Sequence, residues 1–225
     1  MPPSISSSDG GRRQAWSRVL LLLALGAGVQ AAPGAAAATP AAGDIIRHVV
    51  AAQTAAAVSS ADVQLRLRIH KGPAEPPDCV FNGTLRVEQG RQIVQVQQQS
   101  AGVVCALANR YALGRLFEAS EPLESFLARF DFSVTGEKLV DGGPWYLVQG
   151  TSRDPQGNPH RLALWIDDAR GTVPEGTISY AWGDIDTQQT YTRLNNAWIL
   201  TRQLLAARRF DASLELEYRN FVFAH

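Results

Sequence analysis

The sequence has few of the residues that redox and metal sites use. Its 225 residues include two cysteines, Cys79 and Cys105, and because they do not form a C-x-x-C pair we expect no dithiol redox chemistry. The four histidines are scattered without the spacing of metal ligands. The motifs G-x-S-x-G, H-E-x-x-H and G-x-G-x-x-G and the P-loop are absent. The sequence therefore predicts no catalytic residue, no metal and no cofactor, and we expect the protein not to be an enzyme.

Charge of one sign is not in excess either. The chain has 21 basic and 21 acidic residues, and without residues 1–38 it has 18 basic and 20 acidic residues. Nucleic-acid binding needs a basic face, and no basic stripe is present. We therefore expect no nucleic-acid partner.

One long apolar run is present, at residues 19–31, and it follows Arg12, Arg13 and Arg18. This order is typical of a secretory signal peptide, and the run is shorter than the ~20 apolar residues of a membrane span. Cleavage after Ala31 and cleavage after Ala38 both fit, and no cysteine near either position offers a lipid anchor. We expect residues 1–38 to be a signal peptide and Ala/Pro linker, residues 39–225 to form one domain, and the product to be periplasmic and not integral to a membrane.

Alternation of apolar and polar residues predicts antiparallel strands over most of the remaining chain. The pattern is strict at residues 62–70, where every second residue is apolar. It recurs, with a tight connection at Asn195-Asn196, at residues 81–87, 94–96, 110–117, 145–153, 160–168, 176–194, 197–207 and 213–223.

Two segments have helical spacing instead. Residues 43–59 predict an amphipathic helix with Asp44 as N-cap and an end near Ser59. Residues 120–130 predict a shorter helix, with Ser120 as cap, Pro122 in the first turn, and apolar residues from Leu123 to Phe130 on one side. The expected fold class is thus mainly β with two short helices.

Two cysteines in an exported chain predict a structural disulfide. They flank a hairpin that we expect to turn at Gly90 and Arg91, which sets Cys79 opposite Gly102. Since Cys105 is three residues further on, a bulge or a third strand would have to bring the two sulfurs together.

Two aspartate pairs are the remaining candidates for chemistry. Asp167 and Asp168 end a strand with side chains on opposite faces, so a role in the following turn is favoured over an acid–base pair. Asp184 and Asp186 form a D-x-D on one strand face, which we expect to be exposed to solvent; a metal would need further oxygen ligands that the sequence does not mark.

The chain has more apolar side chains than one sheet covered by two short helices is expected to bury. They either fill a closed core or line a cavity with an apolar occupant, and the sequence leaves both open. The aromatic members are Phe81, Phe126, Phe130, Trp145, Trp165, Trp182 and Trp198.

The order of these elements resembles the periplasmic lipoprotein-carrier superfamily of LolA-like and LolB-like proteins, also described as outer membrane lipoprotein-sorting proteins. Residues 82–94 resemble its second and third strands through Gly83, Leu85 and Val87. Residues 109–120 resemble the next hairpin, residues 121–130 the lid-like helix, and residues 162–173 a late strand and turn.

The resemblance implies an incomplete antiparallel β-barrel, or half-barrel, closed by a helical lid around the acyl chains of lipids or lipoproteins. It implies membrane-anchored donor or acceptor proteins as further partners. The residues expected to contact the ligand are Phe81, Leu85, Val87, Leu123, Phe126, Leu127, Phe130, Trp145, Trp165 and Trp182. One departure concerns the arginine-proline pair that latches the family's lid: the matching segment here is Glu88, Gln89 and Gly90, with Arg91 two residues late.

These observations predict a non-enzymatic periplasmic binding or transport protein. Three alternatives stay open. One is a regulatory sensor of envelope stress that binds a protein partner, and a second is a structural relative with a filled core and no lipid. The third is an enzyme on an unfamiliar β-scaffold, with Asp184 and Asp186 as its acidic groups.

Overall fold

The structure is a computed structural model that describes residues 25–27, 39–69, 78–88, 91–102, 105–106 and 121–224. Within these residues, ten strands form one antiparallel sheet in the order β4-β3-β2-β11-β10-β9-β8-β7-β6-β5, and a short strand, β1, pairs with β10. The first part of the sheet contains β1 (Leu25–Ala27), β2 (Val58–Ile69), β3 (Cys79–Glu88) and β4 (Arg91–Gln99). The remaining strands are β5 (Phe130–Val140), β6 (Gly143–Ser152), β7 (Arg161–Asp167), β8 (Thr172–Tyr180), β9 (Gly183–Leu194), β10 (Ala197–Ala207) and β11 (Ala212–Phe223).

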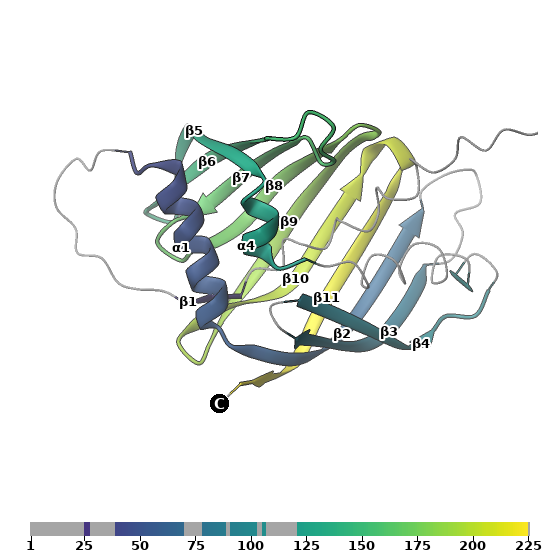
Figure 1. Ribbon diagram of the computed structural model, residues 1–225. Coiled ribbons are helices and arrows are strands. Elements are labelled where there is room, and N and C mark those ends of the chain that lie inside the picture. The colour runs from purple at the N-terminus through teal and green to yellow at the C-terminus, as the bar shows by residue number, and fades with distance from the viewer. Residues whose placement is uncertain are drawn as a thin grey trace, which may run out of the picture.

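The sheet is open and strongly bent, with α1 (Ala42–Ala55) and α4 (Leu123–Leu127) on its concave side (Figure 1). Its edge strands β4 and β5 do not pair with each other within the described residues. Bulges interrupt the register at several places, among them Leu200/Arg202, Val134/Gly136 and Trp165/Asp167. Because a bulge bends and twists its strand, these positions help to curve the sheet. The predicted half-barrel with two helices is confirmed.

Short turns connect neighbouring strands of the meander. Asn195 and Asn196 both have positive φ, at 49° and 62°, which suits the two-residue turn between β9 and β10. Asp141 and Gly142 do the same between β5 and β6, with φ of 51° and 79°. The tight connection predicted at Asn195-Asn196 is therefore confirmed.

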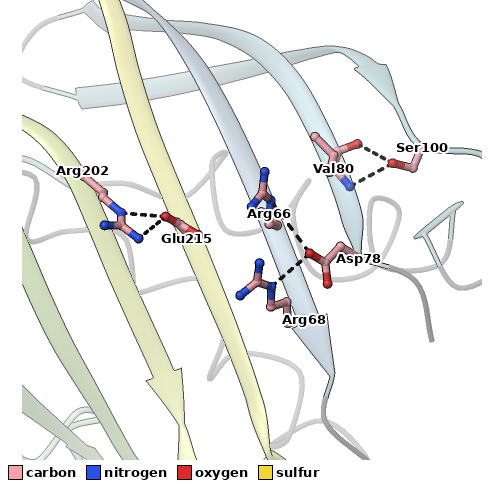
Figure 2. A network of polar contacts seen from close by, with 7 residues as sticks. All are labelled: Arg66, Arg68, Asp78, Val80, Ser100, Arg202 and Glu215. Atoms are coloured by element: carbon pink, nitrogen blue, oxygen red, sulfur yellow. Dashed lines mark hydrogen bonds and ion pairs between the residues drawn. The ribbon is translucent and has the colours of Figure 1, made fainter. Parts of the chain in front are cut away.

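The two faces of the sheet differ in chemistry. On the concave face the side chains are mainly aliphatic and aromatic and are largely buried. On the convex face, ion pairs join neighbouring strands, as Figure 2 shows for Arg202 with Glu215 and for Arg66 and Arg68 with Asp78. Exposed pairs of this kind contribute little stability, so their main effect is to keep the convex face solvated.

Both helices begin and end at other residues than predicted. α1 starts at Ala42, and Asp44 pairs with Arg47 in its first turn instead of capping the helix. It ends at Ala55, because Ala57 has a positive φ of 47° and β2 starts at the next residue. α4 has Pro122 at its N-cap, and the predicted capping residue Ser120 lies outside the described residues.

Some strand predictions also need correction. Residues 176–194 belong to two strands, β8 and β9, separated by a turn at residues 181–182. Phe130 starts β5 instead of ending a helix, and β5 itself was not predicted. The strand expected at residues 110–117 lies outside the described residues, as does most of the predicted signal peptide; β1 falls within that peptide.

Cys79 and Cys105 form a disulfide with a Cα–Cα distance of 5.3 Å. The hairpin register is one correction: Glu88 pairs with Arg91, so Arg91 belongs to β4 and not to the turn predicted at Gly90 and Arg91. A bulge between Asn82 and Gly83 shifts the register near the cysteine end. A Cβ on Gly83 would lie 2.3 Å from the carbonyl oxygen of Gln95, so only glycine permits this close approach of β3 and β4.

Replacing both cysteines with serine is expected to lower the free energy of unfolding by about 3 to 4 kcal/mol. The bond closes a loop between residues 26 positions apart, which restricts the unfolded chain. Urea unfolding of the oxidised wild type and of the double variant measures the difference, with reduced wild type as the control. A loss below about 1 kcal/mol would contradict this account.

Replacing Gly171 with alanine is expected to weaken the docking of α1. Gly171 has φ of 62°, and its Cβ would lie 2.5 Å from the Cβ of Ala52 in α1. Gly142 is the matched control, since its φ is 79° and no described atom lies within 4 Å of the added Cβ. Both variants should lose about 1 to 2 kcal/mol from the left-handed backbone, and Gly171→Ala about 1 to 3 kcal/mol more from the clash. Equal losses in urea unfolding would contradict the predicted contact.

Candidate functional site

The deepest part of the concave face is a row of directly paired side chains. Phe81 of β3 pairs with Leu65 of β2, Leu65 with Leu216 of β11, and Leu216 with Gln203 of β10. All four have a relative exposure of 0%. Partners in an antiparallel sheet point to the same side, so the row crosses the floor of the half-barrel.

The opposite arm of the half-barrel continues this apolar surface. Val148, Leu164 and Leu162 lie on the concave side of β6 and β7, and Leu162 pairs with Ile178 of β8. All four are buried. The apolar face thus extends over both arms of the sheet.

Helix α4 brings an aromatic cluster onto this face. The ring of Phe126 lies 5.3 Å from that of Phe130, and Phe130 lies 6.1 Å from Phe132. Arg129 holds the end of the helix: its guanidinium lies 4.9 Å from the Phe126 ring and 2.6 Å from a Glu121 oxygen. These contacts fix α4 against β5 at one end of the sheet.

Seven of the ten predicted ligand contacts belong to this concave side. Two of them, Val87 and Leu123, are half-buried and so remain partly accessible. The other five are buried: Phe81, Leu85, Phe126, Leu127 and Phe130. Their role in ligand binding stays a prediction.

The predicted places of Trp145 and Trp165 are wrong. Leu147, two residues after Trp145, pairs with Trp165, and both tryptophans lie on the convex face, opposite to Val148 and Leu164. Lys138 lies over both indole rings, at 4.9 Å from Trp145 and 4.3 Å from Trp165. Alternation alone groups residues by face but does not tell which face is inside, and here both faces of β7 carry apolar residues.

Trp182 lies at the rim of the half-barrel. It is in the turn between β8 and β9, stacks on Tyr180 at 5.0 Å, and contacts Phe210 at 5.1 Å. It is half-buried against the core and lies away from α4's aromatic cluster in the sheet order.

Arg91 does not take the place of the family's latch. The register pairs it with Glu88 on the convex side of the hairpin, and it is exposed. The concave face of that hairpin carries Val87 and Val94 instead. Arg91 therefore points away from the concave face.

Asp167 and Asp168 organise the turn between β7 and β8. Asp167 accepts the backbone N–H of Arg170 at 3.2 Å, and its side chain contacts the indole of Trp145 on the convex side. Asp168 lies 3.2 Å from Nδ1 of His48 in α1, on the concave side. The two carboxylates thus serve different partners, as expected for a turn.

Burial dominates the electrostatics of Asp167. It raises the pKa of the Asp167 carboxyl above its ordinary value, although the Arg170 guanidinium, hydrogen bonds from Arg170 and Ala169, and the Trp145 side chain oppose this shift. A buried carboxylate with a raised pKa also occurs in catalytic sites, but here its partners belong to one turn and a neighbouring strand.

Both carboxylate oxygens of Asp186, in the D-x-D, accept hydrogen bonds from other side chains of the protein. Its two oxygens accept Thr177 Oγ1 at 3.0 Å and Arg208 Nε at 2.5 Å. Asp184 lies on the same convex face and is exposed. In the part of the chain that the structure describes, no group of three or more His, Cys, Asp or Glu side chains is arranged to hold a metal ion.

Sequence reasoning missed a set of polar side chains on the concave face. They come from three adjacent strands: Thr187, Gln189, Gln203 and Tyr218 are buried, and Tyr191 is half-buried. The sequence of β10 does not show which face Gln203 is on. Its apolar residues occur in adjacent pairs instead of alternating with polar ones, and a bulge near Leu200 shifts the register. The phase of Gln203 could not be assigned without the register.

Comparison with solved structures finds this architecture elsewhere. A LolA superfamily protein from Nitrosomonas europaea superposes with a TM-score of 0.55 at 11% identity, covering 83% of this chain and 95% of that chain. The chain has a LolA-like fold. A DUF1329 family protein from Desulfovibrio piger has a TM-score of 0.55 at 10% identity, covering 81% of this chain and 91% of that one.

A domain described as an outer membrane lipoprotein-sorting protein, from Vibrio parahaemolyticus, also shares the LolA-like fold. Its TM-score is 0.54 at 10% identity, covering 81% of this chain and 93% of that one. No family model and no curated protein sequence matches the chain. No helix among the described residues is long and apolar enough to cross a membrane.

Replacing Asp167 with asparagine is expected to change how stability depends on pH. Because the pKa of Asp167 is raised on folding, the unfolded chain releases this proton first as pH rises above about 3.8. The wild type should therefore lose stability relative to Asp167→Asn as pH rises from the ordinary pKa to the raised one. Urea unfolding between about pH 3 and about pH 7 measures this. Parallel curves for the two proteins would contradict it.

Proposed function

We propose that this protein is a non-enzymatic periplasmic carrier whose concave face binds the acyl chains of lipids or lipoproteins. The observation that carries the proposal is the continuous apolar floor from Phe81 to Leu216 on the concave side of a LolA-like fold, the side on which α1 and α4 also lie. The sorting-protein domain with the same fold supports this choice of ligand class.

The magnitude of the hydrophobic effect favours a long-chain ligand. Each methylene removed from water contributes ~0.8 kcal/mol, so a 16-carbon chain contributes roughly 12 kcal/mol. Association itself costs about 4 to 15 kcal/mol in lost freedom, so a short chain would bind weakly. A carrier of this kind needs most of an acyl chain to be enclosed.

Ligand entry requires a covering segment to move, because the floor of the face is fully buried. We assign this movement to α4, which has five residues and is held by Arg129 and the phenylalanine cluster. Leu123 is half-buried at its start and is placed to contact an entering chain. In this proposal α4 acts as the lid, and ligand replaces the contacts that it makes with the sheet.

Placing a charge at Leu123 is expected to abolish lipid retention, because an unpaired carboxylate against an acyl chain is strongly unfavourable. Ser125→Glu is the matched control, since it adds the same side chain to an exposed position of the same helix. Native mass spectrometry of the purified proteins, followed by organic extraction, measures bound lipid, and circular dichroism checks the fold.

Lipid in defined stoichiometry on wild type and Ser125→Glu, with little on Leu123→Glu, is the expected result. Equal retention by both variants would show that α4 does not line the site. A wild type that stays free of lipid after incubation with lipoprotein and mixed lipids would overturn the carrier and favour a filled core.

A further inference from the structure

Three buried polar side chains on the concave face have no hydrogen-bond partner among the described residues. They are Gln203, with both amide atoms unpartnered, Thr187 through its hydroxyl, and Tyr218 through its phenol. Their relative exposures are 0%, 2% and 3%. Buried polar groups are nearly always hydrogen-bonded, so three such groups on one face indicate a missing partner.

The three side chains are neighbours across β9, β10 and β11. Gln203 pairs with Gln189 of β9 and Leu216 of β11, while Thr187 and Tyr218 lie two residues from these partners on the same face. Such diagonal neighbours are about 7 to 8 Å apart, within reach of a common ligand group. Gln203 therefore lies between the other two and can share a ligand with either, while Thr187 and Tyr218 lie on opposite sides of it along the strands.

On the neighbouring strand, the side chain of Gln189 has a hydrogen-bond partner within the described part of the chain, unlike that of Gln203. The hydroxyl of Tyr191 donates to the Gln189 side chain and accepts the backbone N–H of Val173 at 3.3 Å. The same face thus satisfies one buried amide internally and leaves the next one, at Gln203, unsatisfied. A leucine at position 203 would avoid this unfavourable burial.

We propose that Gln203, together with Thr187 and Tyr218, is the hydrogen-bonding anchor for the carbonyl-bearing linkage of a bound acyl lipid. The inference rests on the proposed function and adds the chemical class of the ligand: an acyl ester or amide, not a plain hydrocarbon or an ether lipid. Gln203 Nε2 and the Tyr218 hydroxyl donate to the carbonyl oxygen. Gln203 Oε1 and Thr187 accept a neighbouring hydroxyl or N–H of the ligand.

The surroundings suit this role. Leu216, Leu65 and Phe81 continue the row from Gln203, so an acyl chain anchored at its carbonyl can lie along apolar side chains. Burial raises the pKa of Tyr218 well above its ordinary value, which keeps the phenol a donor. A low-dielectric site also strengthens each hydrogen bond made there.

Two lipids that differ only in the carbonyl test the anchor: 1-hexadecanoylglycerol, an ester, and 1-O-hexadecylglycerol, the corresponding ether. Displacement of bound N-phenyl-1-naphthylamine measures the affinity for each. The wild type should prefer the ester by about tenfold, the size of one net hydrogen bond. Gln203→Leu should reduce this preference, because only the Tyr218 hydroxyl then donates to the carbonyl, and without ligand it should melt at a higher temperature than wild type.

Gln188→Leu is the matched control, because it makes the same change on the exposed convex side of β9 and should keep the tenfold preference. If Gln203→Leu does not fold, Tyr218→Phe carries the same test and should reduce the preference, whereas Thr187→Val should weaken the binding of both lipids alike. Equal affinity of the wild type for both lipids would overturn the anchor while the carrier stands. No displacement by either lipid would overturn the carrier itself.

Discussion

The pairing of β2 with β11 joins the beginning and the end of the domain, and the concave face depends on it. Ala212 pairs with Ile69 at one end of this contact and Phe223 with Val58 at the other. The contact connects the β2–β3–β4 hairpins to the meander from β5 to β10 and makes the row from Gln203 to Phe81 continuous. Without it, each arm would expose its apolar side, and a sheet must bury such a face against something.

The two helices complete this arrangement in different ways. α1 is long enough to pack a full apolar side, including Ile45 and Val49, and its contacts with Gly171 and Asp168 fix it to one turn of the sheet. α4 is a short segment held by one aromatic cluster and one arginine. In the proposed carrier, the firmly docked α1 would stay in place while the small α4 moves to admit a ligand.

Polar groups are distributed unevenly between the faces, and this distribution bears on function. On the convex face, charged side chains find partners in neighbouring strands, as Asp186 does with Thr177 and Arg208. On the concave face, Gln203 has none among the described residues. Stability alone favours an apolar residue there, since an unmade hydrogen bond in a low-dielectric interior is unfavourable. The proposed carbonyl anchor would give this amide the partner that the described residues do not supply.

Local patterns in the sequence were sufficient for most of β2, the turn at Asn195-Asn196 and the existence of both helices, because alternation, turn chemistry and helical spacing act over a few residues. They also indicated the apolar contacts of α4 and the disulfide between Cys79 and Cys105. Only the tertiary structure decided which side of each strand faces inward, because that depends on registers and bulges set by strands far apart in the chain. For this reason Trp165 lies outside and Gln203 inside, although neither place is evident from the neighbouring residues.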